Sequence, residues 1–236
     1  MLTLKPRHAP ANGLAFWVAL CLASILGCNT GDYFASFFGH ISGLPVLIAA
    51  FAGVLFVEQR DAGSSTAFYW IAIIIVRTAA TNLADFFAHG VGLVPALGAL
   101  AVLLVLSMLL ARRLRAAAPA TPGLPTVDGP YWLTMLLAGT LGTALGDFSS
   151  FHTGLGLAGA SLALSALVAV LVAVKLRSPM PLSYWLIVVA IRTAGTSVGD
   201  FFAHTIGLWQ STLVFAVLLT AFLWKTPRRG AAVAAS

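Results

Sequence analysis

Four aspartates recur at matching places in the chain, and their spacing suggests a shared chemical role. Asp32 and Asp85 are 53 residues apart, as are Asp147 and Asp200, and 115 residues separate the two pairs. A histidine follows each aspartate within eight residues, namely His40, His89, His152 and His204. Carboxylates and imidazoles together suit divalent ions such as Mn, Fe, Zn, Co or Ni. Both groups also carry protons, so the pattern is equally suited to proton movement.

Two arginines occupy the same register as these aspartates. Residues four apart lie on one face of a helix. That spacing joins Arg77, Thr81, Asp85 and His89, and again Arg192, Thr196, Asp200 and His204. The other two copies keep the aspartate but lose the arginine; they read Ser24, Cys28, Asp32, Ser36 and Gly139, Thr143, Asp147, Phe151. The even-numbered copies therefore look specialised.

These positions supply the candidate site. The candidate transport or polar-core residues are Asp32, Asp85, Asp147, Asp200, Arg77, Arg192, Thr81 and Thr196. The candidate metal ligands are Asp85, His89, Asp200 and His204, with His40 and His152 as further candidates. Four aspartates against two arginines leave a charge of −2 if all are ionised, which favours a bound cation or protons. The alternative is structural, because the same side chains could tie the repeats together by hydrogen bonds between helices.

Composition places these residues in a membrane protein. The chain has 236 residues, of which 60% are hydrophobic and 8% are charged, whereas a soluble domain has about 25% charged residues. The net charge of +6 comes from basic residues grouped between apolar runs, which is a topology signal rather than a nucleic-acid patch. Cys21 and Cys28 lie in the first apolar run without disulfide or metal-ligand spacing, so we expect small buried apolar side chains.

The apolar runs predict an all-α integral membrane protein of eight transmembrane helices. The predicted ranges are 13–38, 43–58, 67–89, 93–112, 130–151, 155–175, 183–204 and 207–225. They form four parallel two-helix repeats, each opening on an aromatic-Trp pair and passing its midpoint at a Gly-Leu pair. We expect pseudo-twofold halves at 1–115 and 130–236, joined by a proline-rich cytoplasmic linker at 116–129.

The basic residues also predict the orientation. Apart from Arg77 and Arg192, they precede or follow whole two-helix units, and the short links inside units contain no Lys or Arg. The positive-inside rule then places both termini in the cytoplasm and the Asp/His links toward the outer face. Trp17, Trp70, Trp132 and Trp185 are expected near the cytoplasmic interface as headgroup anchors.

The pattern Trp…Gly-Asp-Phe…His…Gly-Leu, repeated over residues 14 to 225, resembles a family of bacterial integral membrane proteins. Its members consist of four tandem copies of a two-helix repeat of unknown function and are often labelled uncharacterised membrane-anchored proteins. The resemblance implies a bacterial inner-membrane location and this architecture, but no substrate.

Two functions remain open. The first is a transporter, with divalent metal ions as substrate and proton coupling through the repeated Asp and His residues. The second is a non-transporting sensor, assembly factor or structural subunit. We do not expect an enzyme, because HExxH is absent from the sequence and no pair of acids one turn apart lies within an apolar run. The expected partners are the lipid bilayer and a small inorganic ion or other small solute; an oligomer is open, a nucleic acid is not expected, and no cofactor is certain.

Overall fold

The computed structural model describes residues 9–61, 65–114, 125–177 and 183–226, which contain eight α-helices and no strand. The helices are α1 (Leu14–Phe38), α2 (Leu44–Arg60), α3 (Ala67–Val91), α4 (Leu93–Leu114), α5 (Gly129–Phe151), α6 (Gly156–Arg177), α7 (Ser183–Ile206) and α8 (Leu208–Lys225). Each begins and ends within two residues of its predicted range. Most of the linker predicted at 116–129 lies outside the described residues.

Local sequence sets several of the helix ends. Gly92 and Gly207, from the repeated Gly-Leu pairs, have φ of 90° and 95° and end α3 and α7. This left-handed conformation costs glycine little because it has no Cβ. At the start of α5, the carboxylate of Asp128 accepts a hydrogen bond from the backbone N–H of Tyr131, which caps the helix.

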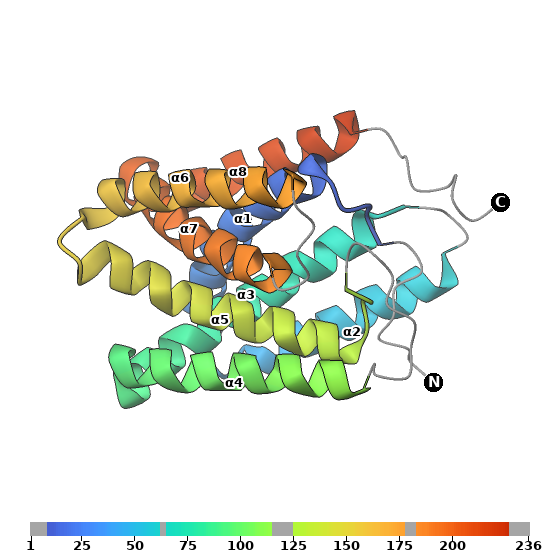
Figure 1. The fold of residues 1–236 in the computed structure, drawn as a ribbon, viewed down its shortest axis with the longest axis horizontal. Helices are drawn as coiled ribbons and strands as arrows, with labels where there is room; N and C mark the ends of the chain where they lie inside the picture. Colours follow the sequence, from blue (N-terminus) through green and yellow to red (C-terminus); the bar gives the residue numbers. More distant parts are fainter. Residues whose placement is uncertain (1–8, 62–64, 115–124, 178–182, 227–236) are drawn as a thin grey trace.

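The first helix of every unit belongs to an inner ring, and the second helix lies outside it. Helices α1, α3, α5 and α7 each contact the next in a closed ring. Each outer helix packs mainly on the inner helix of the following unit, so α2 covers α3, α4 covers α5, α6 covers α7, and α8 covers α1. The last unit thereby closes on the first, and the two halves share one core. Figure 1 shows the links α3–α4, α5–α6 and α7–α8 at the same end of the molecule.

Glycines let the inner helices approach closely within each half. A Cβ on Gly27 of α1 would lie 2.5 Å from Cγ of Arg77, and one on Gly142 of α5 would lie 2.4 Å from Cβ of Arg192. These two contacts correspond under the 115-residue offset. The same packing is thus built twice, once by α1 with α3 and once by α5 with α7.

Three of the four repeated tryptophans are core residues rather than exposed anchors, which corrects the sequence-based expectation for them, whereas Trp185 is half-buried. Trp17, Trp70 and Trp132 are 1%, 3% and 4% exposed. They lie at seams between inner and outer helices; Trp132, for example, meets the ring of Phe51 from α2 at a centroid distance of 5.1 Å. These tryptophans are buried because an indole is the largest side chain available to fill such a seam.

Six helices are long and apolar enough to cross a membrane, namely α1, α3, α4, α6, α7 and α8. Of the other two, α2 has only 17 residues, and α5 is rich in glycine and threonine. The outer surface is apolar, with Leu162 76% and Val94 63% exposed. Exposed side chains of this kind are typical of a protein surrounded by lipid.

Candidate functional site

The inner helices stack their repeated residues in layers across the axis of the ring. Four residues along each inner helix, about one turn, separate the arginine, hydroxyl and aspartate layers, and the aromatic layer lies eight residues before the arginine layer. The aromatic layer is Phe16, Tyr69, Tyr131 and Tyr184; the arginine layer is Ser24, Arg77, Gly139 and Arg192; the hydroxyl layer is Cys28, Thr81, Thr143 and Thr196; and the aspartate layer is Asp32, Asp85, Asp147 and Asp200. The contacts described below show that these layers meet at the axis.

The aspartate layer lies toward the end of the ring that carries the links inside units. Its four carboxylates are partly exposed, and each interacts electrostatically with the other three. The four carboxylates are therefore close enough to influence one another's charge. When they are ionised, they attract cations.

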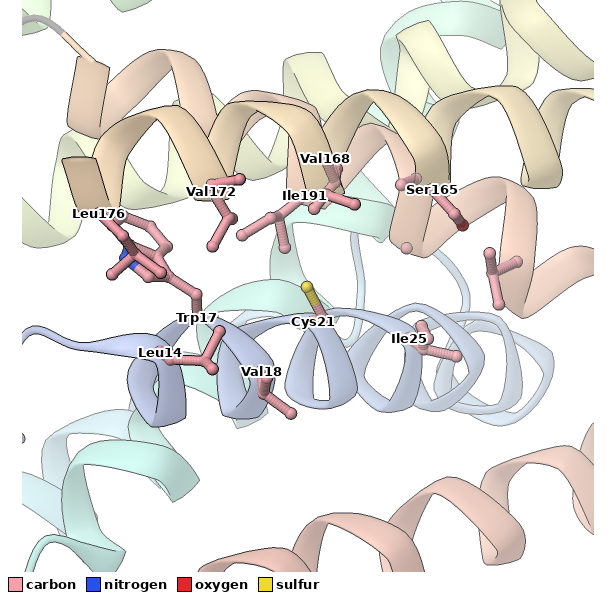
Figure 2. Close-up of a pocket in the computed structure, with 15 residues that line it drawn as sticks. Leu14, Trp17, Val18, Cys21, Ile25, Ser165, Val168, Val172, Leu176 and Ile191 are labelled. Atoms are coloured by element: carbon pink, nitrogen blue, oxygen red, sulfur yellow. The ribbon is translucent and has the colours of Figure 1, made fainter. Parts of the chain in front are cut away.

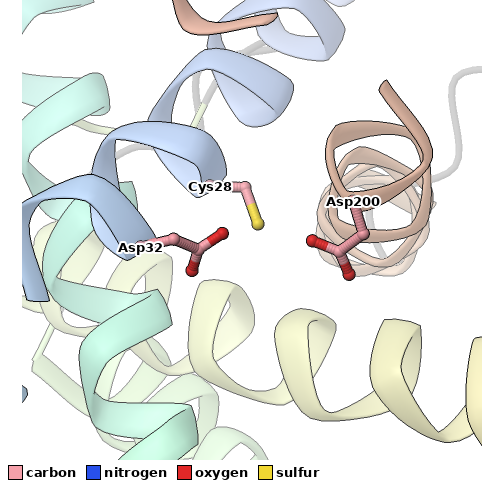
Figure 3. A group of neighbouring side chains, drawn as sticks. All are labelled: Cys28, Asp32 and Asp200. Carbon is pink, nitrogen blue, oxygen red and sulfur yellow. The ribbon is translucent and has the colours of Figure 1, made fainter. Parts of the chain in front are cut away.

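Three potential metal-ligating atoms come together within this region. A carboxylate oxygen of Asp32, a carboxylate oxygen of Asp200 and Sγ of Cys28 all lie within 4.8 Å of one another. Figure 3 shows Cys28 and Asp32 on α1 facing Asp200 on α7. They meet because α1 and α7 are neighbours in the ring. A thiolate with two carboxylates is a donor set suited to zinc or cobalt.

Cys28 is the member of this group that sequence reasoning missed. Its side chain is buried, at 1% exposure, which agrees with the expected burial but not with a purely apolar role. The signal was present in the spacing, because Cys28 precedes Asp32 by four residues and occupies the place that threonine holds in the other three copies.

Asp85 has a histidine neighbour from the first unit. His40, in the link between α1 and α2, places Nδ1 3.4 Å from Oδ2 of Asp85. The ring of His89 lies beside that of His40, with centroids 6.0 Å apart. Nδ1 of His89 donates to the carbonyl oxygen of Asp85 at 2.7 Å. The structure therefore joins His40, Asp85 and His89 at the exposed edge of the aspartate layer.

The two other candidate histidines, His204 and His152, have partners on their own helices or beside them. His204 is exposed and donates from Nδ1 to the carbonyl oxygen of Asp200 at 2.9 Å, so it turns back on its own helix. His152 is exposed and stacks on Phe148, with centroids 5.6 Å apart.

The four ligands first expected to act together, Asp85, His89, Asp200 and His204, do not form one group. Within the described ranges, the residues whose ligand atoms gather in a set of three or more are Cys28, Asp32 and Asp200. Asp200 thus gathers its ligand atom with those of α1, and His204, which also interacts electrostatically with Asp200, is not part of that set.

Arg77 is fully buried and its guanidinium is hydrogen-bonded to every inner helix. Its acceptors are the carbonyl oxygens of Ser24, Gly139 and Arg192, each at 3.3 Å, and the hydroxyls of Thr81 at 3.3 Å, Thr196 at 2.6 Å and Thr143. It also interacts electrostatically with all four aspartates. Arg77 is therefore the hub of the arginine and hydroxyl layers, directed toward the aspartate layer.

Arg192 occupies the equivalent position and is also fully buried, but its guanidinium points the other way. Nη2 meets Sδ of Met135 at 3.3 Å, and the electrostatic neighbours of Arg192 are Arg77 and the three tyrosines of the aromatic layer. Nε and Nη1 have no hydrogen-bond partner among the described residues. The difference has a steric cause, because Arg77 already fills the hydroxyl layer.

The aromatic layer closes the opposite part of the axis. The hydroxyl of Tyr131 lies 2.6 Å from that of Tyr69 and 3.0 Å from that of Tyr184. All three tyrosines are at most 2% exposed, and the ring of Phe16 lies 6.4 Å from those of Tyr69 and Tyr184. The polar axis thus runs from an open aspartate layer through two buried arginines to a closed aromatic layer.

Comparison with known proteins supports the repeat but adds no activity. No curated protein and no solved structure matches the chain. The model of the Repeat of Unknown Function (DUF347) matches twice, at residues 130–180 and 183–229, which correspond to α5 with α6 and to α7 with α8. The second half of the chain therefore contains two copies of this uncharacterised repeat.

Proposed function

We propose that this protein is a multi-pass membrane transporter for a divalent metal ion. The observation that carries the proposal is the convergence of Asp32, Asp200 and Cys28 from two neighbouring inner helices, inside a layer that holds two further carboxylates. The aspartate layer is then the site where the ion first binds.

Charge balance supports a cation as the ligand. Arg77 is the arginine that interacts with all four carboxylates, whereas Arg192 points toward the tyrosines. Four negative charges against one positive charge leave an excess of three if all groups are ionised. A purely structural role would not require this excess, because uncompensated charge within a membrane protein is costly. A divalent ion removes most of it.

The donor atoms indicate which ions fit best. A thiolate favours borderline metals such as zinc and cobalt over magnesium and calcium, which prefer oxygen ligands alone. Protons compete with the metal for the same carboxylates and thiolate. Proton coupling through the aspartates and the neighbouring His40 follows from that competition.

The proposed topology has eight spans, with both termini in the cytoplasm of a bacterial cell and the aspartate layer facing outward. The last turns of α2, α4, α6 and α8 carry basic residues, at the end opposite the links inside units. Positive charge is retained on the cytoplasmic side of a membrane. The helices α2 and α5 cross as parts of the bundle, since α5 is largely shielded from lipid by its neighbours.

The proposal is tested by metal binding to the purified protein. We expect Co²⁺ to bind with a thiolate-to-metal charge-transfer band that Cys28→Ser removes. Asp32→Asn and Asp200→Asn should each weaken binding of Zn²⁺ at least about tenfold, because each removes one charged ligand. Competition with a chromophoric chelator measures these affinities.

Asp61→Asn provides the matched control, since Asp61 caps the end of α2, which lies at the end of the bundle opposite the aspartate layer. It should bind Zn²⁺ as the unmodified protein does. Absence of any binding, or binding that Cys28→Ser, Asp32→Asn and Asp200→Asn all leave unchanged, would contradict the proposal. Retained helix content by circular dichroism excludes misfolding as the cause of a loss.

A non-transporting metal sensor or structural protein is the second candidate. It is favoured by the hydrogen bonds of Arg77 to all four inner helices and by the closed aromatic layer, which together obstruct the axis. Uptake of Zn²⁺ into liposomes containing the protein separates the two functions. Binding without uptake supports the sensor, and uptake that Asp32→Asn abolishes supports the transporter.

A further inference from the structure

A groove with no role in the aspartate layer runs along the outside of the ring. It lies between α1 and α6, with α7 as its floor, and has a volume of about 470 Å³. Figure 2 shows Trp17, Cys21 and Ile25 of α1 on one side and Val168 and Val172 of α6 on the other. Its size falls in the range of roughly 300–1,000 Å³ that small-molecule sites occupy.

Small residues and a wide helix spacing keep this groove open. Helices α1 and α6 touch only slightly, because both pack on α7 instead. Ala169, Ala173 and Gly195 line the space and fill little of it. The corresponding place in the other half is filled differently: Trp132, the counterpart of Trp17, is covered by Phe51. The groove is thus a specific feature of one side.

One end of the groove is polar. The indole Nε1 of Trp17 is buried and has no hydrogen-bond partner in the described part of the chain. In Figure 2 this nitrogen lies on the side of Leu176, at the end of α6. Lys175 and Arg177 flank Leu176 in the same last turn. A hydrogen-bond donor and two cationic residues therefore adjoin one end of an otherwise apolar groove.

We propose that the groove binds one acyl chain of an anionic membrane phospholipid. The chain lies along Val168, Val172 and Ile25, an ester carbonyl accepts the hydrogen bond of Trp17, and the phosphate lies near Arg177. This arrangement satisfies a buried donor that the protein leaves unpaired, which otherwise costs stability. Basic residues at a membrane surface attract anionic lipid headgroups. The proposal is independent of the metal site.

Native mass spectrometry of the protein released from detergent tests the site, with phosphatidylglycerol and phosphatidylcholine as probes. The unmodified protein should retain one phosphatidylglycerol. Ala169→Phe and Ala173→Phe place a ring in the groove and should lower retention at least about tenfold, since losing contact with even two methylenes has that effect. Ala166→Phe is the control, because Ala166 is exposed on the same helix but does not line the groove; it should retain the lipid.

The headgroup contact is tested by Arg177→Gln, which should reduce the preference for phosphatidylglycerol over phosphatidylcholine while retention of some lipid persists. Two kinds of result would overturn the proposal. One is a failure of lipid binding: the unmodified protein retains no phospholipid, or both groove-filling variants retain as much phospholipid as the unmodified protein does. The other is a dimer of the unmodified protein that Ala169→Phe converts to a monomer, because the groove would then hold a second copy of the chain.

Discussion

Replacing Arg77 by methionine is expected to destabilise the protein by about 3 kcal/mol or more. The guanidinium of Arg77 is hydrogen-bonded to carbonyl or hydroxyl groups on all four inner helices. Methionine has a similar length but donates no hydrogen bond. The hydroxyls of Thr143 and Thr196 then lose the donor from which they accept, although each still donates to a carbonyl of its own helix, and the four helices lose the group that joins them.

The same substitution at Arg192 provides the matched comparison. This arginine holds the equivalent position in the repeat and is equally buried, but two of its nitrogens have no partner in the described residues. Removing an unpaired buried charge is often neutral or stabilising. We therefore expect Arg192→Met to change the free energy of unfolding by less than about 1 kcal/mol, or to raise it.

Thermal unfolding of the two variants in detergent, followed by circular dichroism, measures the difference. The midpoint should fall strongly for Arg77→Met and stay close to that of the unmodified protein for Arg192→Met. Equal losses at the two positions would show that the opposite directions of the two arginines have no energetic consequence.

Alanine at Gly142 is expected to separate α5 from α7 and to cost about 2 kcal/mol. The added Cβ would lie 2.4 Å from Cβ of Arg192, 3.0 Å from its carbonyl carbon and 3.1 Å from the backbone nitrogen of Thr193. Two of these atoms belong to the backbone, so no side-chain rotation relieves the overlap. The helices must move apart where Gly142 packs against α7.

Gly98 of α4 is the control, because a Cβ there meets nothing within 4 Å. Alanine favours a helix over glycine by roughly 0.5–1 kcal/mol, so Gly98→Ala should leave stability unchanged or raise it. Unfolding midpoints compare the two variants directly. If Gly142→Ala proved as stable as Gly98→Ala, close approach of α5 and α7 would not be a requirement of the fold.

Much of the fold follows from the sequence because its signals are local. Runs of about 20 apolar residues define helices whatever surrounds them, and the Gly-Leu pairs mark the turns. The offsets of 53 and 115 residues show that each helix pair is one repeated unit. The exceptions were the tryptophans, whose burial depends on outer helices that cover them from another unit.

The site was predictable only in part. A spacing of four residues places Arg77, Thr81 and Asp85 on one face of a helix, and the structure keeps them on the axis. The same spacing contains Cys28 beside Asp32. This spacing does not indicate, however, which helix lies next to α7. It therefore could not predict that Asp200 meets Asp32 and Cys28 of α1.

The sequence by itself determined the eight helices, their grouping into repeated pairs, and the face of each inner helix that carries polar residues, because periodicity along one helix is a property of the chain. The tertiary structure alone decided the order of helices around the ring, the meeting of Asp32, Cys28 and Asp200, and the opposite directions of Arg77 and Arg192. Those features depend on distances between helices. Such distances are set by glycine contacts and by competition for shared acceptors across the axis, which no spacing within a single helix records.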